Sequence, residues 1–137
     1  VMADLHLRVV TPEKLLIDEV VSQVNVSTDL GQLGILPNHA NLMAKLTPGE
    51  LIIKKGGKTD VLAIGDGFLQ MADNTLSIMT DLAAYEVDID ERAVEEAKKR
   101  AEAALEQKLS DEEYAETLAV LEKSLAQLKI KRRHRVR

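Results

Sequence analysis

Three histidines are the residues in this sequence best suited to bind a metal, and their spacing argues against it. His6, His39 and His134 lie far apart in a chain of 137 residues, and none has a partner at the short spacing of metal ligands. The chain has no cysteine, which excludes disulfides, thiolate catalysis and cysteine-ligated metal centres. We therefore predict no metal site.

A second candidate for chemistry is the run Gly56-Gly57-Lys58-Thr59, which resembles the end of a phosphate-binding loop. That loop requires a glycine five residues before its Gly-Lys pair, and position 52 is Ile. The run fits the turn of a β-hairpin better than a strand-to-helix turn. The serines of this half fall on predicted strands, without the sharp turn of a nucleophile elbow. We predict no catalytic residues and a protein that is not itself an enzyme.

The charge of the chain is strongly polarised. The formal net charge is −5, but the last nine residues, 129–137, hold six of the basic residues and no acid. Without those six, the remaining chain has 12 basic and 23 acidic residues, a net charge of −11. The basic end is either a solvated terminus or a hook for an acidic partner surface. Nucleic acid is a poorer partner, because the acidic body would repel phosphates.

The composition predicts a soluble, folded chain. Hydrophobic residues make up 45% and charged residues 30%, which is typical of a globular protein and not of a disordered one. Aromatic residues make up only 2%, so the core must be aliphatic and stacking platforms for single-stranded nucleic acid are not expected. No apolar run approaches the roughly 20 residues of a membrane span, and we expect no signal peptide or organelle-targeting segment.

The elements that must carry these residues fall into two groups, and the first is a set of strands. From Leu5 to about Leu82, short apolar stretches with a period of two are separated by turn residues. Eight or more strands at this spacing predict an antiparallel β-sandwich or a flattened barrel. Residues 31–46 place glycines, a Pro-Asn turn and His39 between two apolar runs. They predict strand, exposed corner, strand, with the corner either a contact surface or an ordinary sandwich corner.

Near Tyr85 the hydrophobic period changes to about 3.6, which predicts a C-terminal helical hairpin. Asp88 with Glu91, and Ser110 with Glu113, have the spacing of capping boxes that would start its two helices. The first helix carries a ridge of alanines and the second a four-three-four-three seam of larger residues. They are Ala93, Ala97, Ala101 and Ala104 in the ridge, and Tyr114, Leu118, Leu121, Leu125 and Leu128 in the seam. Because two helices bury little area alone, the hairpin is either permanently folded onto the sandwich or alternates between it and a partner.

With this order of elements, four segments resemble the epsilon subunit of the bacterial F-type ATP synthase, which is equivalent to the mitochondrial delta subunit. They are residues 9–12 (Val-Val-Thr-Pro), 31–46, 66–69 (Asp-Gly-Phe-Leu) and 90–93 (Asp-Glu-Arg-Ala). The Gly-x-Leu-Gly-Ile-Leu-Pro-x-His-Ala run within residues 31–46 is the most specific of them. The resemblance covers nearly the whole chain. It implies an N-terminal antiparallel β-sandwich of about ten strands, residues 1–86, and a C-terminal antiparallel helical hairpin, residues 87–137.

The resemblance also implies a role and partners. Such a subunit is not catalytic; it sits in the central rotor stalk of a proton-translocating ATP synthase, bound to the gamma subunit and to the ring of c subunits. By position, Gln32, Asn38 and His39 would make the rotor contact. The location would be the cytoplasmic face of the bacterial plasma membrane, peripheral to the bilayer.

The hairpin of such a subunit would have a regulatory task. It would lie compact against the sandwich, or extend along gamma into the alpha/beta catalytic head and block ATP hydrolysis. In the extended form, Arg132, Arg133 and Arg135 would meet an acidic surface of that head. Two packings a few kcal/mol apart could be biased by a ligand or by membrane energisation.

Some members of the family bind ATP in the compact hairpin, and the match to that site is incomplete. Their motif is Ile/Leu-Asp-x-x-Arg-Ala, whereas residues 89–93 read Ile-Asp-Glu-Arg-Ala, which turns Arg92 by about 100° around the helix. Arg100 is available, and Lys123 stands where relatives carry an arginine, but a lysine offers no bidentate fork. We predict no firm cofactor, with Asp90, Arg92, Arg100 and Lys123 as the contacts of any weakly bound ATP.

The residues leave open a hypothesis of another class, a stand-alone sandwich that binds a nucleotide or another small ligand and is regulated by its hairpin. Tight binding of ATP by the isolated chain would favour that hypothesis over a rotor subunit.

Overall fold

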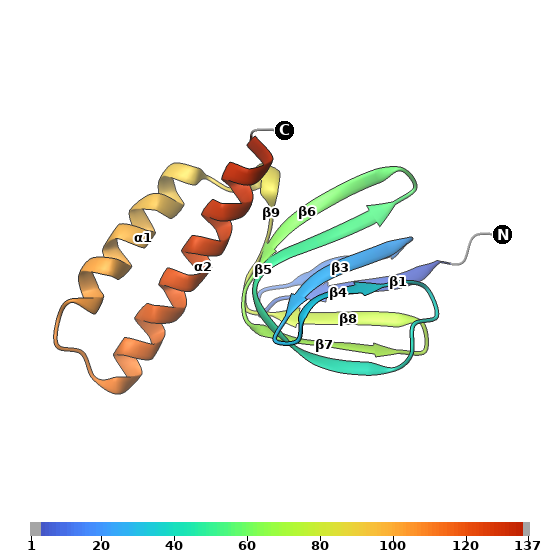
Figure 1. Ribbon diagram of the computed structural model, residues 1–137, viewed down its shortest axis with the longest axis horizontal. Helices are drawn as coiled ribbons and strands as arrows, with labels where there is room; N and C mark the ends of the chain where they lie inside the picture. The colour runs from blue at the N-terminus through green and yellow to red at the C-terminus, as the bar shows by residue number, and fades with distance from the viewer. Residues whose placement is uncertain (1–3, 136–137) are drawn as a thin grey trace.

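The computed structural model describes residues 4–135, with side chains described as far as Arg132. These residues form nine strands followed by two α-helices, in agreement with the predicted sandwich and hairpin (Figure 1). The strands are β1 (Leu5–Val10), β2 (Leu15–Val21), β3 (Gln23–Thr28), β4 (Gly31–Ile35), β5 (Leu42–Lys55), β6 (Lys58–Ile64), β7 (Gly67–Ala72), β8 (Thr75–Thr80) and β9 (Ala83–Tyr85). A single 3₁₀ turn among the described residues, η1 (Glu86–Asp88), leads to α1 (Glu91–Leu105) and α2 (Asp111–Arg135).

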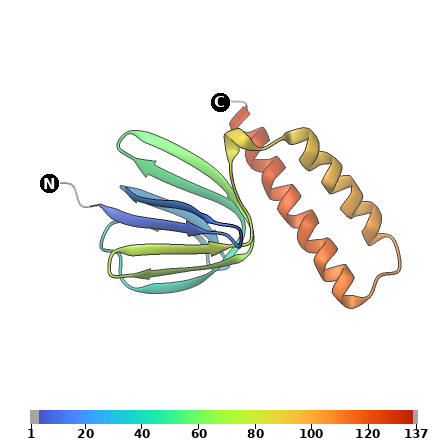
Figure 2. The same ribbon diagram turned by 180° about the vertical axis from the view of Figure 1, so that it is seen from behind.

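The strands form two layers that share the 14-residue strand β5. One layer has the order β2-β1-β8-β7-β5, and the other has the order β4-β3-β5-β6-β9. The first half of β5 pairs with β7 and its second half with β6. The strand therefore passes from one layer into the other near Pro48, which closes one side of the sandwich (Figures 1 and 2).

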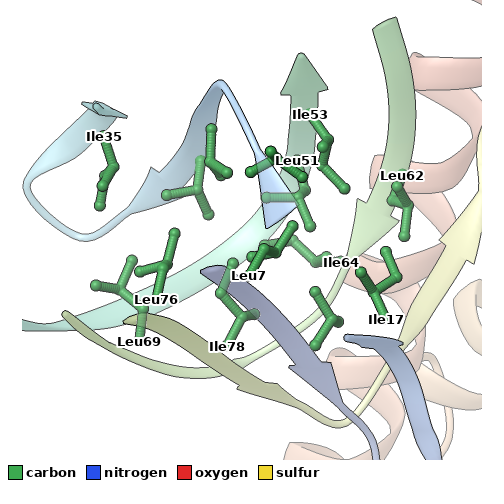
Figure 3. Packing of buried hydrophobic residues seen from close by; sticks show 14 of the residues in the cluster. Leu7, Ile17, Ile35, Leu51, Ile53, Leu62, Ile64, Leu69, Leu76 and Ile78 are labelled. Atoms are coloured by element: carbon green, nitrogen blue, oxygen red, sulfur yellow. The ribbon is translucent and has the colours of Figure 1, made fainter. Parts of the chain in front are cut away.

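The core between the layers is aliphatic, as the composition predicts. Leu5, Leu7 and Val9 point inward from β1 and are fully buried, while the intervening His6 and Arg8 point outward. The other strands add inward-facing side chains that meet these in the middle of the sandwich (Figure 3). They include Ile17, Leu51, Leu62, Leu69, Leu76 and Ile78. Removing this apolar surface from water is what holds the two layers together.

Two tight turns connect neighbouring strands through left-handed backbone. Gly56 and Gly57, with φ of 52° and 86°, join β5 to β6, which is the hairpin turn predicted from the sequence. Asp73 and Asn74, with φ of 51° and 58°, join β7 to β8. After glycine, short polar side chains adopt this region most readily, because they can bond locally to the backbone.

The two helices pack side by side, and α2 lies between α1 and the sandwich (Figures 1 and 2). Because α2 has a neighbour on two sides, its apolar residues do not form the single buried seam that the spacing predicts. Leu128 is buried, but Tyr114 and Leu125 are 48% and 47% exposed. Ser124 and Ile130, which lie outside the predicted seam, are buried instead.

The starts of the helices confirm one predicted capping box and correct the other. The Ser110 hydroxyl accepts the Glu113 N–H at 3.2 Å, and the Glu113 carboxylate accepts the Ser110 hydroxyl at 2.8 Å. For α1 the prediction is wrong by two residues. The N-cap is Asp90, whose carboxylate accepts the N–H groups of the second and third helical residues at 3.1 and 3.2 Å. Asp88 belongs to η1, and this short turn delays the start of the helix.

Candidate functional site

An apolar row crosses the outer face of the first layer. Leu15, Val10, Met79 and Phe68 are successive cross-strand neighbours on β2, β1, β8 and β7. Leu15, Met79 and Phe68 are 44%, 37% and 53% exposed, and Met43 of β5, on the same face beside Phe68, is 69% exposed. We call these five residues the outer apolar row.

The outer apolar row borders an open hollow of about 580 Å³, which is lined by Met43, Ala44, Lys45, Gly67 and Phe68. Large apolar side chains that gather on a surface mark a contact with another molecule. Sequence reasoning missed this row although the signal is present. Phe68 and Met79 occupy outward positions of their strands, where the alternation would otherwise place polar residues.

The corner between β4 and β5 presents Asn38 and His39, as the sequence predicts. The Asn38 N–H donates to Asn74 Oδ1 at 2.7 Å, and the Asn74 amide donates to the Asp4 carbonyl oxygen at 2.6 Å. Nδ1 of the exposed His39 lies 2.8 Å from the Ala40 carbonyl oxygen and donates to it. The β7–β8 turn thus supports the corner through Asn74.

Gln32 lies at the other end of β4, next to the hairpin. Its amide donates to Ser27 Oγ at 3.2 Å, and it lines a cavity of about 140 Å³ together with Glu50 of β5 and Ala126 and Lys129 of α2. The strand β4 separates Gln32 from the corner, at a rise of about 3.3 Å per residue. The structure therefore does not bring the three predicted rotor contacts together.

Helix α2 is attached to the sandwich by an apolar cluster and by ion pairs. Ile130 packs with Ile89 and with Ala63 of β6, and all three are nearly or fully buried. Near this cluster, Lys131 Nζ donates to the Glu86 carbonyl oxygen at 3.3 Å. Earlier in α2, Lys123 Nζ lies 2.5 Å from a carboxylate oxygen of Asp81.

Arg132 ties the two helices to each other. Its Nε donates to the Glu91 carboxylate at 3.0 Å and its Nη2 to the Glu95 carboxylate at 2.7 Å. These two hydrogen bonds raise the pKa of the Arg132 guanidinium. Of the three arginines predicted to meet the catalytic head, Arg132 is thus engaged within the hairpin, while the side chains of Arg133 and Arg135 lie outside the described residues.

The four residues predicted for ATP do not converge. The Asp90 carboxylate caps α1, and Lys123 is paired with Asp81. The Arg92 side chain is 91% exposed, and Arg100 is exposed farther along the same helix. Weak ATP binding stays a prediction, and in this arrangement it would require Lys123 to leave its partner on the sandwich.

The described residues contain no group of three or more histidine, aspartate or glutamate side chains placed to hold a metal ion. His6 lies on the outer face of β1 beside Asp18 of β2. Within residues 4–135, neither helix is long and apolar enough to pass through a membrane. The surfaces described above are suited to contacts with other proteins.

Comparison with known proteins finds relatives over both parts of the chain. The family model for the beta-sandwich domain of the ATP synthase delta/epsilon chain matches residues 4–86, and the model for its long alpha-helix domain matches residues 88–132. The ATP synthase epsilon chain of Nitratidesulfovibrio vulgaris is 34% identical over 127 residues, which cover 93% of this chain and 95% of that protein.

Two solved structures share the fold. A chain of the Euglena gracilis mitochondrial ATP synthase (OSCP/F1/c-ring) superposes with a TM-score of 0.76 at 23% identity, covering 98% of this chain and 82% of that one. A chain of the Tetrahymena thermophila mitochondrial ATP synthase (central stalk/c-ring) gives a TM-score of 0.52 at 21% identity, covering 66% and 69%. At these identities the likeness shows the fold, a sandwich followed by helices.

Proposed function

This chain belongs to the delta/epsilon chain family of ATP synthase, and we propose that it couples the gamma subunit to the ring of c subunits in the rotor of a proton-translocating F-type enzyme. It is an accessory subunit of the complex and not a catalytic one. In this proposal the complex holds it at the cytoplasmic face of the bacterial plasma membrane, and it touches the membrane only through its partners.

The outer apolar row is the observation that carries the proposal. Its three most exposed members, Met43, Phe68 and Leu15, are between 44% and 69% exposed, and a subunit that is permanently part of a complex can leave such side chains for a partner to cover. We assign this row to gamma. The Asn38–His39 corner is polar and held by Asn74, which suits the polar loops of the c ring.

The hairpin is the regulatory part of the proposal. Helix α2 packs against β5, β6 and η1 through the apolar cluster around Ile130 and through ion pairs of Lys123 and Lys131. Relative motion is the default expectation for partly polar contacts between parts of one chain. Tyr114 and Leu125 remain about half exposed on α2. When released, the hairpin would extend along gamma, bury these side chains against the alpha/beta head and restrain ATP hydrolysis.

An assembly experiment tests the assignment of the row to gamma. Phe68→Asp places a charge at the centre of the row, and we expect it to weaken binding to purified gamma by about 30-fold or more, the loss typical of a central interface residue. The matched control is Val87→Asp, because Val87 is 75% exposed on η1 and lies outside the row. Undiminished binding of the Phe68→Asp chain in calorimetry and co-purification would remove the row from the gamma contact.

A further inference from the structure

One of the ion pairs between the hairpin and the sandwich lies in the middle of α2. Lys123 Nζ and Asp81 Oδ2 are 2.5 Å apart, and the two side chains are 25% and 41% exposed. Asp81 lies between β8 and β9, where the chain leaves the first layer for the second. Lys123 reaches it from the face of α2 that is turned toward the sandwich.

The backbone beneath Asp81 is fixed by a small network of hydrogen bonds. The Gly65 N–H donates to the Leu82 carbonyl oxygen at 3.0 Å, and the Asp81 N–H donates to the Asp66 carbonyl oxygen at 3.0 Å. Thr80, only 5% exposed, places its hydroxyl 3.2 Å from the Gly65 N–H, which donates to it. The same hydroxyl lies 3.0 Å from the carbonyl oxygens of Asp66 and Leu82, either of which accepts its proton. None of these hydrogen bonds involves α2, so the sandwich alone positions the Asp81 backbone.

Gly65 leaves the space that this ion pair occupies. A β-carbon at position 65 would overlap the Asp81 carboxylate and would lie 3.3 Å from Cε of Lys123 and 3.2 Å from Cβ of Leu82. Unlike Gly67, with φ of 152°, Gly65 is not among the residues with positive φ, so the backbone itself accepts a side chain there. The glycine matters at this position because of what packs on it.

The Lys123–Asp81 pair lies far along α2 from the point where the hairpin joins the sandwich. Lys131, which contacts Glu86 of η1, and the Ile130 cluster lie close to the point where the hairpin leaves the sandwich. Lys123 is eight residues away, or about 12 Å along the helix. The Arg132 bonds to Glu91 and Glu95 run between the helices, so they survive if the hairpin leaves the sandwich as a unit. The Lys123–Asp81 pair does not.

We propose that Gly65, Thr80, Asp81 and Lys123 form an electrostatic latch that sets the balance between the docked and the released hairpin. Because the pair is partly exposed, salt screens it, and docking weakens as the ionic strength rises. Losing the pair shifts the balance by about two- to fivefold, the range of partly exposed ion pairs. The latch regulates ATP hydrolysis only if the proposed function of the hairpin is right, whereas docking itself is independent of it.

The test measures opening of the hairpin in the full chain. The sequence has no cysteine, so Ala63→Cys adds a unique thiol at a fully buried position in the cluster with Ile130. The rate at which a thiol reagent modifies this cysteine is proportional to the opening equilibrium when closing is fast. In this background we expect Lys123→Ala and Asp81→Asn each to raise the rate by about two- to fivefold, and Gly65→Ala to raise it without changing any charge.

Two further variants make the result decisive. The charge exchange Asp81→Lys with Lys123→Asp should return the rate toward that of the parent, and Lys99→Ala, which removes an exposed lysine of α1, should leave it unchanged. Unchanged rates in Lys123→Ala and Asp81→Asn, or an exchange variant no slower than the single variants, would overturn the latch.

The ATPase rate of the assembled complex separates the latch from the regulatory role. Faster labelling with a lower ATPase rate supports both. Faster labelling with an unchanged ATPase rate keeps the latch and counts against restraint of hydrolysis by the hairpin.

Discussion

Tyr85 shows how a single side chain can report on the joint between sandwich and hairpin. It is half-buried in β9, opposite Leu62 of β6. Burial raises the pKa of the Tyr85 phenol above its ordinary value, and the carboxylates of Asp60 and Glu19 raise it further. The phenol is neutral at physiological pH, and its environment resists ionisation.

We predict an alkaline loss of stability that originates at Tyr85. The unfolded chain releases the phenolic proton near pH 10, and the folded chain holds it to a higher pH. The contribution of Tyr85 is therefore complete below about pH 10 and is lost as the pH rises through the folded pKa. Because the sequence has two tyrosines, Tyr114→Phe leaves Tyr85 as the chromophore. Its spectrophotometric midpoint should be higher in buffer than in concentrated urea.

The control for this titration is Tyr85→Phe in the wild-type chain. That variant should lose less stability than the parent between pH 9 and pH 11, because it has no phenol at position 85 to ionise. Equal midpoints in buffer and in urea would show that the environment of Tyr85 does not perturb its ionisation.

Whether a residue could be placed from the sequence depended on how local its partners are. The inward turn of Leu5, Leu7 and Val9 follows from the period of a strand, which needs only near neighbours. The support of Asn38 comes from Asn74, 36 residues away, and packing rather than spacing decides such a contact. The separation of Gln32 from His39 follows from the geometry of the strand between them. The prediction grouped the two residues because they are close in the sequence and did not take this separation into account.

Two aspartates before α1 could each serve as its N-cap. Asp88 and Asp90 both precede the helix, and Asp88 alone has a Glu three residues later at position 91. The Ile89 N–H, however, donates to the Glu86 carbonyl oxygen at 3.2 Å, which closes η1 and leaves the capping geometry to Asp90. A short 3₁₀ turn has too weak a sequence signal to be predicted at this point.

We predict unequal effects of the two aspartates on stability. Asp90→Ala removes the acceptor of two N–H groups of α1 and should lower the free energy of unfolding by about 1 kcal/mol. Asp88→Ala is its matched control and should change it by less than about 0.5 kcal/mol. Urea denaturation followed by circular dichroism measures both. A larger loss of unfolding free energy in Asp88→Ala than in Asp90→Ala would instead identify Asp88 as the N-cap, as predicted from the sequence.

The buried residues of α2 differ from the predicted seam because α2 packs against two neighbours. The spacing of its large apolar residues assumes one partner helix, whereas α2 packs against α1 and against β5 and β6. Two contact surfaces at different angles bury Leu128 and Ile130 together and leave Leu125 half exposed. The existence of the hairpin was predictable from the period, but the faces of its second helix were not.

For the whole molecule, the surfaces assigned to different tasks adjoin. Lys45 lines both the hollow beside the outer apolar row and a groove of about 550 Å³ between the sandwich and α2. Leu125, half exposed on α2, lines the same groove. A partner that covers the outer apolar row would therefore lie next to the docked hairpin.

A prediction for the assembled complex concerns the basic end of the chain, residues 129–137. Reversing all three arginines would mix two effects, because Arg132 also binds Glu91 and Glu95 within the hairpin. We therefore expect the double variant Arg133→Glu with Arg135→Glu to test the hook alone. It should weaken the inhibition of ATP hydrolysis in the reconstituted complex by about two- to thirtyfold, the effect of two partly exposed ion pairs.

Deletion of residues 87–137 sets the upper limit of that effect, because it removes the hairpin with its basic end. The ATPase rate with the double variant should lie between the rate with the parent chain and the rate with the deleted chain. Added salt should reduce the difference between the double variant and the deletion, because screening weakens the charge contacts that remain in the double variant. An ATPase rate in the double variant equal to that of the parent would leave the basic end a solvated terminus. A deletion that raises no activity would refute inhibition by the hairpin, and one that prevents assembly would make the hairpin a structural part of the rotor.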